Sequence, residues 1–515
     1  MIPIFDKPSE NDYDIPQNMY WTNDTGNGRP GYVKTHGLST RVASLPTTAG
    51  TTSDTVRGMV EYNNRVYYAG LKSLYWYNAA SEVGSSTAFL YGIDYERVFM
   101  VAHDNYVVAV EPYYGATGYA GGGGGIKYYN VNTSAAGTAL ATSFFQGICY
   151  QDGYFIAWNM YNDKFYISSL KDPTTWSLLD FEGAEYRDDK IVVIESLGEN
   201  LYVFGTRTLE VYYNSGNSDF PFVRLEGGVF DYGCKAAFSL INVNGVLYFL
   251  ANDLTVVRLN GFSPERVSTA FVEKKWTKYL TVENAYAWTY SYGGESFYVL
   301  TFPTADDAGP LNNAYRYGKT FVLNVNTGVW HSWIDTTGTT DTQFPVTHCV
   351  QIQQYKIVGG EDQIIYVGCR GGAYVNTSPG LYTLVKKWDH SVFKLPNALA
   401  TQIARKIYTI NGTSSVECCI YTPIIEAKRE RMFFNEFELY AKEDVGATDV
   451  SPSLTLSWSD DRGTNFSTGR TLSLGTATGG SKVITAHRLG TSYDRIFRLK
   501  SDHRYDNVIY GGYLR

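Results

Sequence analysis

A hairpin unit recurs along most of this 515-residue chain and limits the folds that it can adopt. Each unit has Asn, Asp, Gly or Glu turn residues, then alternating aromatic and aliphatic residues, then a Gly or polar break and a second strand. Alternation with a period of two predicts β-strands, and the turn residues predict tight connections between them. The first strands of the units are VYYAG from Val66, YVVAV from Tyr106, YFIAW from Tyr154, LYVFG from Leu201, VLYFL from Val246, FYVLT from Phe297 and IIYVG from Ile364.

The spacing of these units predicts a β-propeller. Most intervals between first strands fall in the forties, which is the length of one four-stranded propeller blade. Six or seven blades would close into a ring and leave no long sheet edge unpaired. The last interval is longer, because the loops at 305–317 and 335–344 add residues. A sandwich of several sheets is the competing architecture, and helices are expected only within 266–278 and 396–406.

Composition supports an all-β chain with more than one domain. Aromatic residues make up 16% of the sequence, with 44 tyrosines and 50 glycines, and these residues favour strands and turns respectively. A chain of this length is too long to fold around a single hydrophobic core. We expect an irregular N-terminal segment at 1–59, a propeller-like domain at 60–393 and a β-sandwich-like domain at 394–515. The first segment should fold only by lying along another part of its own chain or along a neighbouring subunit.

Charge and cysteine content narrow the range of functions that the chain could have. The net charge is −8, from 43 basic and 51 acidic residues, which argues against binding nucleic acid through its phosphates. None of the six cysteines lies in a C-x-x-C pair, and we expect buried free thiols in a protein made in a reducing cytoplasm. No secretion signal or membrane-spanning apolar run is recognisable. No cofactor, metal site or catalytic triad is predicted, since the histidines never pair at ligand spacing.

One turn in the C-terminal part is similar to the Asp-box hairpin, S-x-D-x-G-x-T-W. It contains Ser459, Asp461, Gly463 and Phe466, with Asn465 and Phe466 in place of the usual Thr and Trp. Asp461 is expected to accept hydrogen bonds from backbone amides, and Gly463 to adopt a positive φ. The pattern is typical of a stabilising turn. The functional alternative is a sialidase-like site that acts on glycans.

Other polar clusters are predicted to lie in loops. A run of five glycines precedes a strand rather than a helix, so a flexible hairpin tip is expected instead of a phosphate-binding loop. Acid pairs at 188–189, 306–307, 361–362 and 460–461 are interpreted as solvated turn residues rather than as glycosidase carboxylates or calcium ligands. The candidate interface or channel residues in these loops are Gly121, Gly123, Gly125, Asp306, Asp307 and Tyr315.

The region from about Tyr150 to Trp333 resembles a family of bacteriophage proteins. Its segment LKDPTTWSLLDFEGAEYRDDKIVVIESLGENLYVFGTRTLEVYYNSG is similar, in its turns, strands and breaks, to the tail nozzle or packaged-DNA stabilisation proteins of short-tailed phages. The N-terminal Asn18-Met19-Tyr20 also resembles the opening of that family. Further landmarks in the same order are Phe220-Pro221-Phe222, Gly233-Cys234, Arg266-Val267-Ser268-Thr269, Phe302-Pro303, Gly328 and Trp330-His331.

This resemblance implies a structural protein of the phage tail and not an enzyme. Similar proteins form a six-fold ring below the portal and adaptor, extend the DNA channel, help to retain the packaged genome and anchor a needle, spike or fibres. The implied partners are further copies of the same chain, the portal–adaptor assembly and the distal tail proteins, while DNA passes without sequence-specific binding. The implied location is the virion, after synthesis in the host cytoplasm. A glycan-binding or sialidase-like propeller on the virion is the alternative, and a monomeric intracellular scaffold is the third hypothesis.

Overall fold

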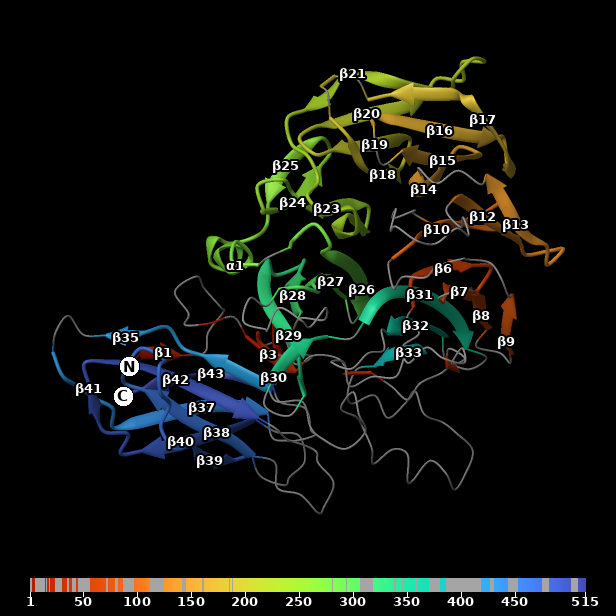
Figure 1. Ribbon diagram of the computed structural model, residues 1–515. Helices are drawn as coiled ribbons and strands as arrows, with labels where there is room; N and C mark the ends of the chain where they lie inside the picture. The colour runs from red at the N-terminus through yellow and green to blue at the C-terminus, as the bar shows by residue number, and fades with distance from the viewer. Residues whose placement is uncertain are drawn as a thin grey trace, which may run out of the picture.

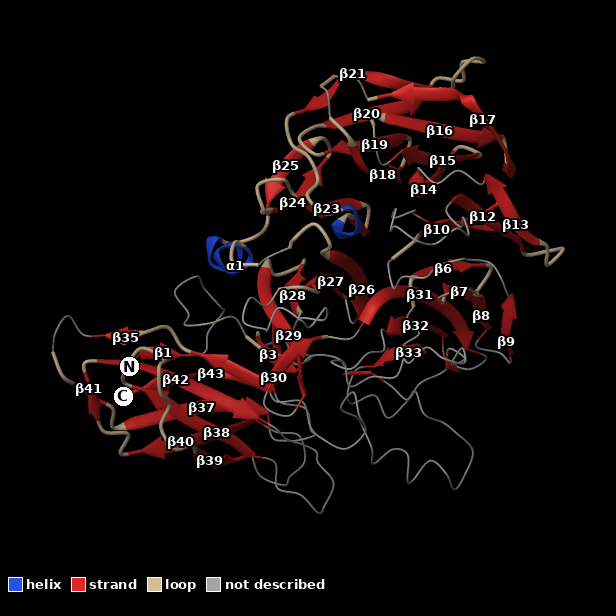
Figure 2. Ribbon diagram, viewed as in Figure 1, coloured by secondary structure: helices blue, strands red, loops and turns tan. Residues whose placement is uncertain are grey.

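In the computed structural model, the regular secondary structure of the described residues is almost all β-strand, as the sequence predicts (Figure 2). The residues that it describes are 2–4, 14, 16–17, 19–23, 30–34, 37–38, 43–44, 56–70, 73–78, 82–86, 97–111, 125–140, 145–159, 162–184, 186–187, 189–279, 281–292, 294–305, 318–337, 340–344, 346–356, 360–369, 380–385, 418–426, 430–442, 453–474, 481–501 and 508–515.

Seven antiparallel sheets of the described residues surround a common centre and form a β-propeller (Figure 1). The first three blades are β6 (Gly58–Tyr62), β7 (Arg65–Ala69), β8 (Leu74–Asn78) and β9 (Glu82–Ser86); β10 (Phe99–His103), β11 (Tyr106–Glu111), β12 (Gly125–Asn130) and β13 (Ala136–Leu140); and β14 (Phe145–Gln151), β15 (Tyr154–Asn159), β16 (Lys164–Ser169) and β17 (Asp172–Gly183). The next two are β18 (Ile191–Leu197), β19 (Asn200–Gly205), β20 (Leu209–Asn214) and β21 (Phe222–Phe230); and β22 (Ile241–Val243), β23 (Val246–Leu250), β24 (Val256–Asn260) and β25 (Ser263–Arg266). The last two contain β26 (Tyr286–Tyr292), β27 (Glu295–Phe302), β28 (Lys319–Asn324), β29 (Val329–Thr337) and β30 (Thr340–Gln343); and β31 (Val346–Lys356), β32 (Gly360–Cys369) and β33 (Gly380–Val385). Strand β31 lies against β6, so the last blade contacts the first and the ring is closed.

The turns inside the blades explain why the hairpins form where the sequence predicts them. In the first two blades, the turn residues Asn63–Asn64 and Asp104–Asn105 all have positive φ. Asp152–Gly153 and Asn244–Gly245 repeat this conformation in later blades. Two consecutive residues with positive φ match the right-handed twist of the flanking strands, and Asn, Asp and Gly tolerate that conformation best.

The N-terminal segment supplies strands to both domains, although an irregular structure was expected for 1–59. Strands β4 (Gly37–Leu38) and β5 (Ala43–Ser44) pair with β33 and complete the outer edge of the last blade. Strands β1 (Ile2–Ile4) and β3 (Gly31–Lys34) pair with β43 (Val508–Leu514), and β2 (Met19–Thr22) pairs with β3. The segment becomes ordered here because it satisfies open strand edges elsewhere in the chain. The proposed domain boundary at 393/394 lies outside the described residues.

The C-terminal part forms two facing sheets that enclose one core. The first sheet adds β37 (Glu436–Lys442) and β40 (Ser481–His487) to β43 and the N-terminal strands. The second sheet contains β34 (Cys418–Tyr421), β35 (Ile425–Glu426), β38 (Ser453–Ser459), β39 (Arg470–Ser473) and β42 (Asp494–Ser501). Two further short strands, β36 (Met432–Phe433) and β41 (Thr491–Ser492), pair with each other. Buried residues of both sheets, such as Phe437, Leu439, Leu456 and Phe497, meet between them.

One α-helix occurs within the described residues, α1 (Ala270–Trp276), inside the range predicted for a helix. Val272 and Trp276 lie four residues apart on its buried face, and the Trp276 ring packs on Phe302, Phe321 and Trp330. The other predicted helix, at 396–406, lies outside the described residues.

Candidate functional site

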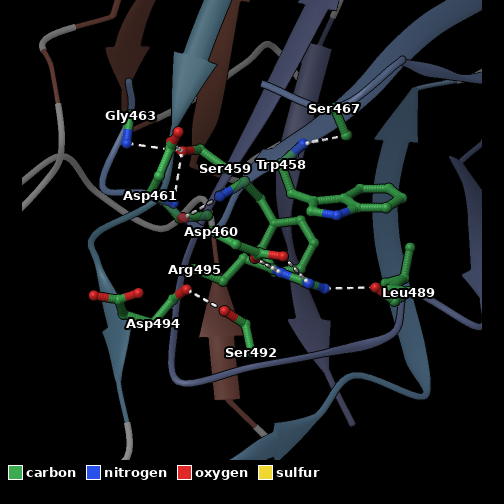
Figure 3. Close-up of polar contacts among 12 residues, drawn as sticks. Trp458, Ser459, Asp460, Asp461, Gly463, Ser467, Leu489, Ser492, Asp494 and Arg495 are labelled. Atoms are coloured by element: carbon green, nitrogen blue, oxygen red, sulfur yellow. Dashed lines mark hydrogen bonds and ion pairs between the residues drawn. The ribbon is translucent and has the colours of Figure 1, made fainter. Parts of the chain in front are cut away.

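The turn between β38 and β39 is held by the side chains of its own residues (Figure 3). The Ser459 hydroxyl donates to Asp461 Oδ1 at 2.6 Å and accepts from the Gly463 amide at 2.8 Å. The backbone amide and side-chain amide of Asn465 donate to the two carboxylate oxygens of Asp461 at 2.8 and 2.7 Å. Gly463 has a φ of +91°, a conformation that favours glycine. Both carboxylate oxygens of Asp461 therefore accept hydrogen bonds from residues of the same turn, which is the role expected of a residue that stabilises the turn.

Phe466 connects this turn to the neighbouring strand. The guanidinium carbon of Arg498, on β42, lies 3.9 Å from the centre of the Phe466 ring. Arg498 also donates from Nε to the Ser457 hydroxyl at 3.0 Å. A cation over an aromatic face is attractive, so the ring that replaces the usual tryptophan packs under Arg498.

Asp461 is expected to stay ionised at unusually low pH. Hydrogen bonds from the Asn465 amide, the Ser459 hydroxyl and the Asn465 side chain lower the pKa of Asp461 to about 2. Because this folded-state pKa lies below the unfolded value, the stabilisation is complete above about pH 4 and is lost as the pH falls through the folded pKa. Titration of ¹³Cγ-labelled aspartate by NMR should give one midpoint near pH 2 that is missing in Asp461→Asn. A midpoint near pH 4 would contradict this role.

Arg495 is buried beside the turn and binds the other member of the acid pair (Figure 3). Its Nε and Nη2 donate to the two oxygens of Asp460 at 2.6 and 2.7 Å, and its Nη1 donates to the Leu489 carbonyl at 2.6 Å. The side chain of Arg495 is 2% exposed, whereas that of Asp460 is 45% exposed. Three rings surround the guanidinium, at 4.5, 5.4 and 5.7 Å from Cζ to the centres of Phe434, Trp458 and Phe497. Asp460, interpreted as a solvated turn residue, is thus the counter-ion of a buried arginine.

Asp189 was also interpreted as a solvated residue, and for this residue the interpretation is wrong. Its side chain is buried and accepts hydrogen bonds in the turn between β19 and β20. The amides of Thr206, Arg207 and Thr208 donate to its carboxylate at 2.9, 2.7 and 3.0 Å, and the hydroxyls of both threonines also donate. Burial alone would raise the pKa of Asp189, but these hydrogen bonds outweigh it and hold the pKa below its usual value.

Replacing Asp189 by alanine is expected to destabilise this blade by about 2 kcal/mol, because several buried donors lose their acceptor. Asp189→Asn keeps the shape and one acceptor oxygen, so its cost should be smaller. Hydrogen exchange at the amides of Thr206, Arg207 and Thr208 measures the effect locally. Equal protection of these amides from exchange in the wild type and in Asp189→Ala would show that the Asp189 carboxylate does not stabilise the turn.

The centre of the propeller is filled by side chains at the level of the short 3₁₀ helix η1 (Ala237–Ser239). This helix contacts β18, β23 and β26 and lies near the middle of the ring of sheets (Figure 2). The Phe238 ring stacks on Phe99, with ring centres 4.3 Å apart, and Phe99 packs edge-on against Trp158 at 5.1 Å. Aromatic residues of the second and third blades and of η1 therefore pack together at this level.

Two family matches cover most of the chain. Residues 6–367 match the family described as bacteriophage P22 Gp10, beta-propeller, and residues 417–515 match that described as bacteriophage P22 Gp10, beta-sandwich. The chain belongs to the bacteriophage P22 Gp10 family. It is therefore a member of a family of structural proteins of the phage tail. The resemblance to tail nozzle proteins and the prediction of a propeller followed by a sandwich are both confirmed.

No curated protein matches the chain. Among solved structures, streptogramin B lyase is 10% identical, with coverage of 68% of this chain and 98% of that chain and a TM-score of 0.40. Puromycin hydrolase is 12% identical, with coverage of 72% and 62% and a TM-score of 0.33. The exo-β-1,3-galactanase of Phanerochaete chrysosporium is 8% identical, with coverage of 93% and 100% and a TM-score of 0.27. At such TM-scores these similarities carry no conclusion about the Gp10-family chain.

In this Gp10-family chain, the described residues 16–17 and 21 contact both the propeller and the sandwich. Gln17 exchanges two backbone hydrogen bonds with Cys419 on β34, at 2.9 and 3.0 Å. On the propeller side, the Ser332 amide on β29 donates to the Pro16 carbonyl at 2.8 Å, and Asn324 Nδ2 donates to the Trp21 carbonyl at 3.1 Å. The segment thus joins an outer propeller strand to the sandwich through main-chain groups.

Of the predicted loop residues, Gly125 is the first residue of β12, where it pairs with Glu111 and has a φ of +131°. Gly121, Gly123, Asp306, Asp307 and Tyr315 lie outside the described residues, and their role at an interface or channel stays a prediction.

Within the part of the chain that the structure describes, no group of three or more His, Cys, Asp or Glu side chains could hold a metal ion. No helix in that part is long and apolar enough to cross a membrane.

Proposed function

We propose that this protein assembles into a ring of six copies that extends the DNA channel below the portal and adaptor. The ring helps to retain the packaged genome and anchors distal tail parts such as a needle, spike or fibres. Membership of the P22 Gp10 family over both domains is the observation that carries the proposal. The protein acts as a structural component of the virion and not as an enzyme, and it is made in the host cytoplasm.

The net charge and the packing at η1 support a DNA path between the copies. Phe238 of η1 stacks on Phe99 of the second blade, and η1 also contacts β18, β23 and β26; this packing between blades supports a channel that runs between the copies of the ring. Six copies, each with a net charge of −8, carry −48 together. An acidic assembly does not hold phosphates tightly, which suits a wall along which the genome slides.

The outer strand β17 supports contacts between copies. It pairs with β16 at Trp176 and at Phe181, and the residues between these two positions bulge out of the ladder. Leu179 in this bulge is 86% exposed and Leu178 is 42% exposed. Exposed apolar residues on a protruding edge are typical of protein contacts. A cyclic ring uses two different surfaces of each copy, and we assign this bulge to one of them.

Purified protein mixed with portal–adaptor rings tests the proposal. Mass measurement in solution should detect binding of six copies, and Leu178→Asp with Leu179→Asp should weaken ring formation while the fold is retained. Val483→Asp, on the sandwich, replaces a side chain that is 52% exposed and is the matched control. A chain that stays monomeric in the presence of portal–adaptor rings would contradict the ring, and release of sugar from cell-surface saccharides would favour the glycan hypothesis.

A further inference from the structure

The large apolar side chains that are exposed among the described residues gather at two opposite ends of the protein. In the propeller they belong to the third and fourth blades and to the link between them: Leu170, Leu178, Leu179, Phe181, Tyr186, Tyr213 and Val223. In the sandwich they are Ile424, Phe433, Val483, Tyr493 and Tyr513. Figure 1 shows these two blades at the top and the sandwich at the lower left. The two groups of one copy are therefore too far apart to contact each other.

The propeller surface is the bulge of β17, where apolar and acidic side chains are exposed together. Leu179 and Asp180 are neighbours in this bulge, and both are exposed. The sequence 174–183 around them contains two acids and no basic residue. Lys164, on the adjacent strand β16, has its Nζ 4.0 Å from the centre of the Phe181 ring. The bulge thus presents leucine side chains with a carboxylate beside them.

The sandwich surface lies where β36 and β41 pair, and it combines exposed rings with a cation. Phe433 is 72% exposed and Tyr493 is 58% exposed. Phe433 pairs with Thr491, which is two residues before Tyr493 in the chain. Arg431 is exposed, and its Cζ lies 5.8 Å from the centre of the Tyr493 ring. Arg431, Phe433 and Tyr493 are together called the end patch.

The charges of the two surfaces are complementary. Residues 428–431 are Lys, Arg, Glu and Arg in the sequence, and the last two of them lie among the described residues. Two further acids beside the end patch, Asp494 and Glu426, both face Arg462, with charged atoms 2.7 and 3.9 Å apart. Opposite charges across an interface speed encounter and fix its register. The acidic bulge therefore suits a surface that carries Arg431.

We propose that the β17 bulge of one copy binds the end patch of the next copy. This inference rests on the proposed ring and names the second of the two surfaces that each copy uses. Leu179 packs against Phe433 and Tyr493 of the neighbour, and Asp180 pairs with its Arg431. Because the two surfaces differ and lie at opposite ends of the chain, the contact can repeat around a rotation axis until the ring closes. Aromatic and arginine side chains are enriched in such interfaces.

Charge reversal tests the contact in full-length protein mixed with portal–adaptor rings. Asp180→Arg and Arg431→Asp should each raise the protein concentration needed for ring formation about tenfold or more, because like charges then meet across the interface. Both changes in the same chain should restore assembly, since each copy again meets an opposite charge. Glu199→Arg is the matched control, because Glu199 is an exposed acid in the turn between β18 and β19, and it should leave assembly unchanged.

Disulfide trapping tests the same contact without changing charge. A chain that carries Leu179→Cys and Phe433→Cys should form crosslinked species of up to six copies on oxidation. Either substitution alone should give none, and the native Cys418 and Cys419 are buried. Dimers formed by Leu179→Cys alone would mean that two bulges meet, which would overturn the proposal.

The outcomes separate this contact from the ring itself. Wild-type rings with no response to either charge reversal would overturn the contact and leave the ring standing. A wild type that stays monomeric on portal–adaptor rings would contradict both. If Arg431→Asp left the ring intact and abolished binding of the distal tail proteins, the end patch would belong to that partner, and the contact between copies would be wrong.

Discussion

Replacing Arg495 by alanine is expected to lower the free energy of unfolding of the sandwich by about 3 kcal/mol. The substitution leaves a space among Phe434, Trp458 and Phe497 and removes the donor to the Leu489 carbonyl. Asp460 is half exposed, so water solvates its released charge and keeps the loss from being larger. The effect should appear as faster hydrogen exchange of the backbone amides in β38 and β42, while the exchange rates in the propeller stay unchanged.

Arg462→Ala is the matched control for this prediction. Arg462 also pairs with a carboxylate, with its Nε 2.7 Å from Asp494 Oδ2, but its side chain is 66% exposed. An exposed ion pair of this kind contributes less than about 1 kcal/mol. Similar losses of protection in the two variants would show that burial of Arg495 does not determine its contribution.

Deleting residues 1–44 is expected to prevent the chain from remaining a soluble folded protein. The deletion removes β4 and β5 from the edge of β33, and β1 and β3 from the edge of β43. Both domains would then have open strand edges, which pair readily with other chains. The buried Trp21 and Tyr32, whose rings pack edge-on at 5.0 Å, would also leave the sandwich core. Size-exclusion chromatography should show aggregates in place of the wild-type species.

Asp14→Asn is the control for the deletion. It weakens the ion pair of Asp14 with Lys275 Nζ, at 2.5 Å between two partly exposed side chains, while all N-terminal strands stay in place, and should cost less than about 1 kcal/mol. A truncated chain that elutes like the wild type, with unchanged exchange in β33 and β43, would mean that the N-terminal strands contribute little to either domain.

The local structure of the hairpins could be predicted from the sequence, because turn residues and alternating strands are short-range signals. The turns at Asn63–Asn64 and Asn244–Gly245 have the backbone conformation that their residue types favour. Completion of the last blade could not be predicted, since its outer strands come from the N-terminal segment, more than three hundred residues away along the chain from β33. Pairing over such a separation leaves no periodic pattern in the sequence.

The structural roles of two aspartates, Asp189 and Asp460, were missed for a related reason. Asp189 and Asp460 each follow or precede another aspartate in polar segments, and such segments are usually solvated. Their actual partners are the 206–208 turn and Arg495, which the sequence does not mark as neighbours. The turn at Ser459–Gly463 was easier to find, because its donors and acceptors lie within a few residues of each other.

Electron microscopy of the protein assembled on portal–adaptor rings with packaged DNA tests the proposed function most directly. We expect six copies around one channel, with DNA density on the axis of the ring and none passing through the filled centre of any propeller at Phe238 and Phe99. DNA density along the axis of a single propeller, or copies attached without rotational symmetry, would contradict the proposed function.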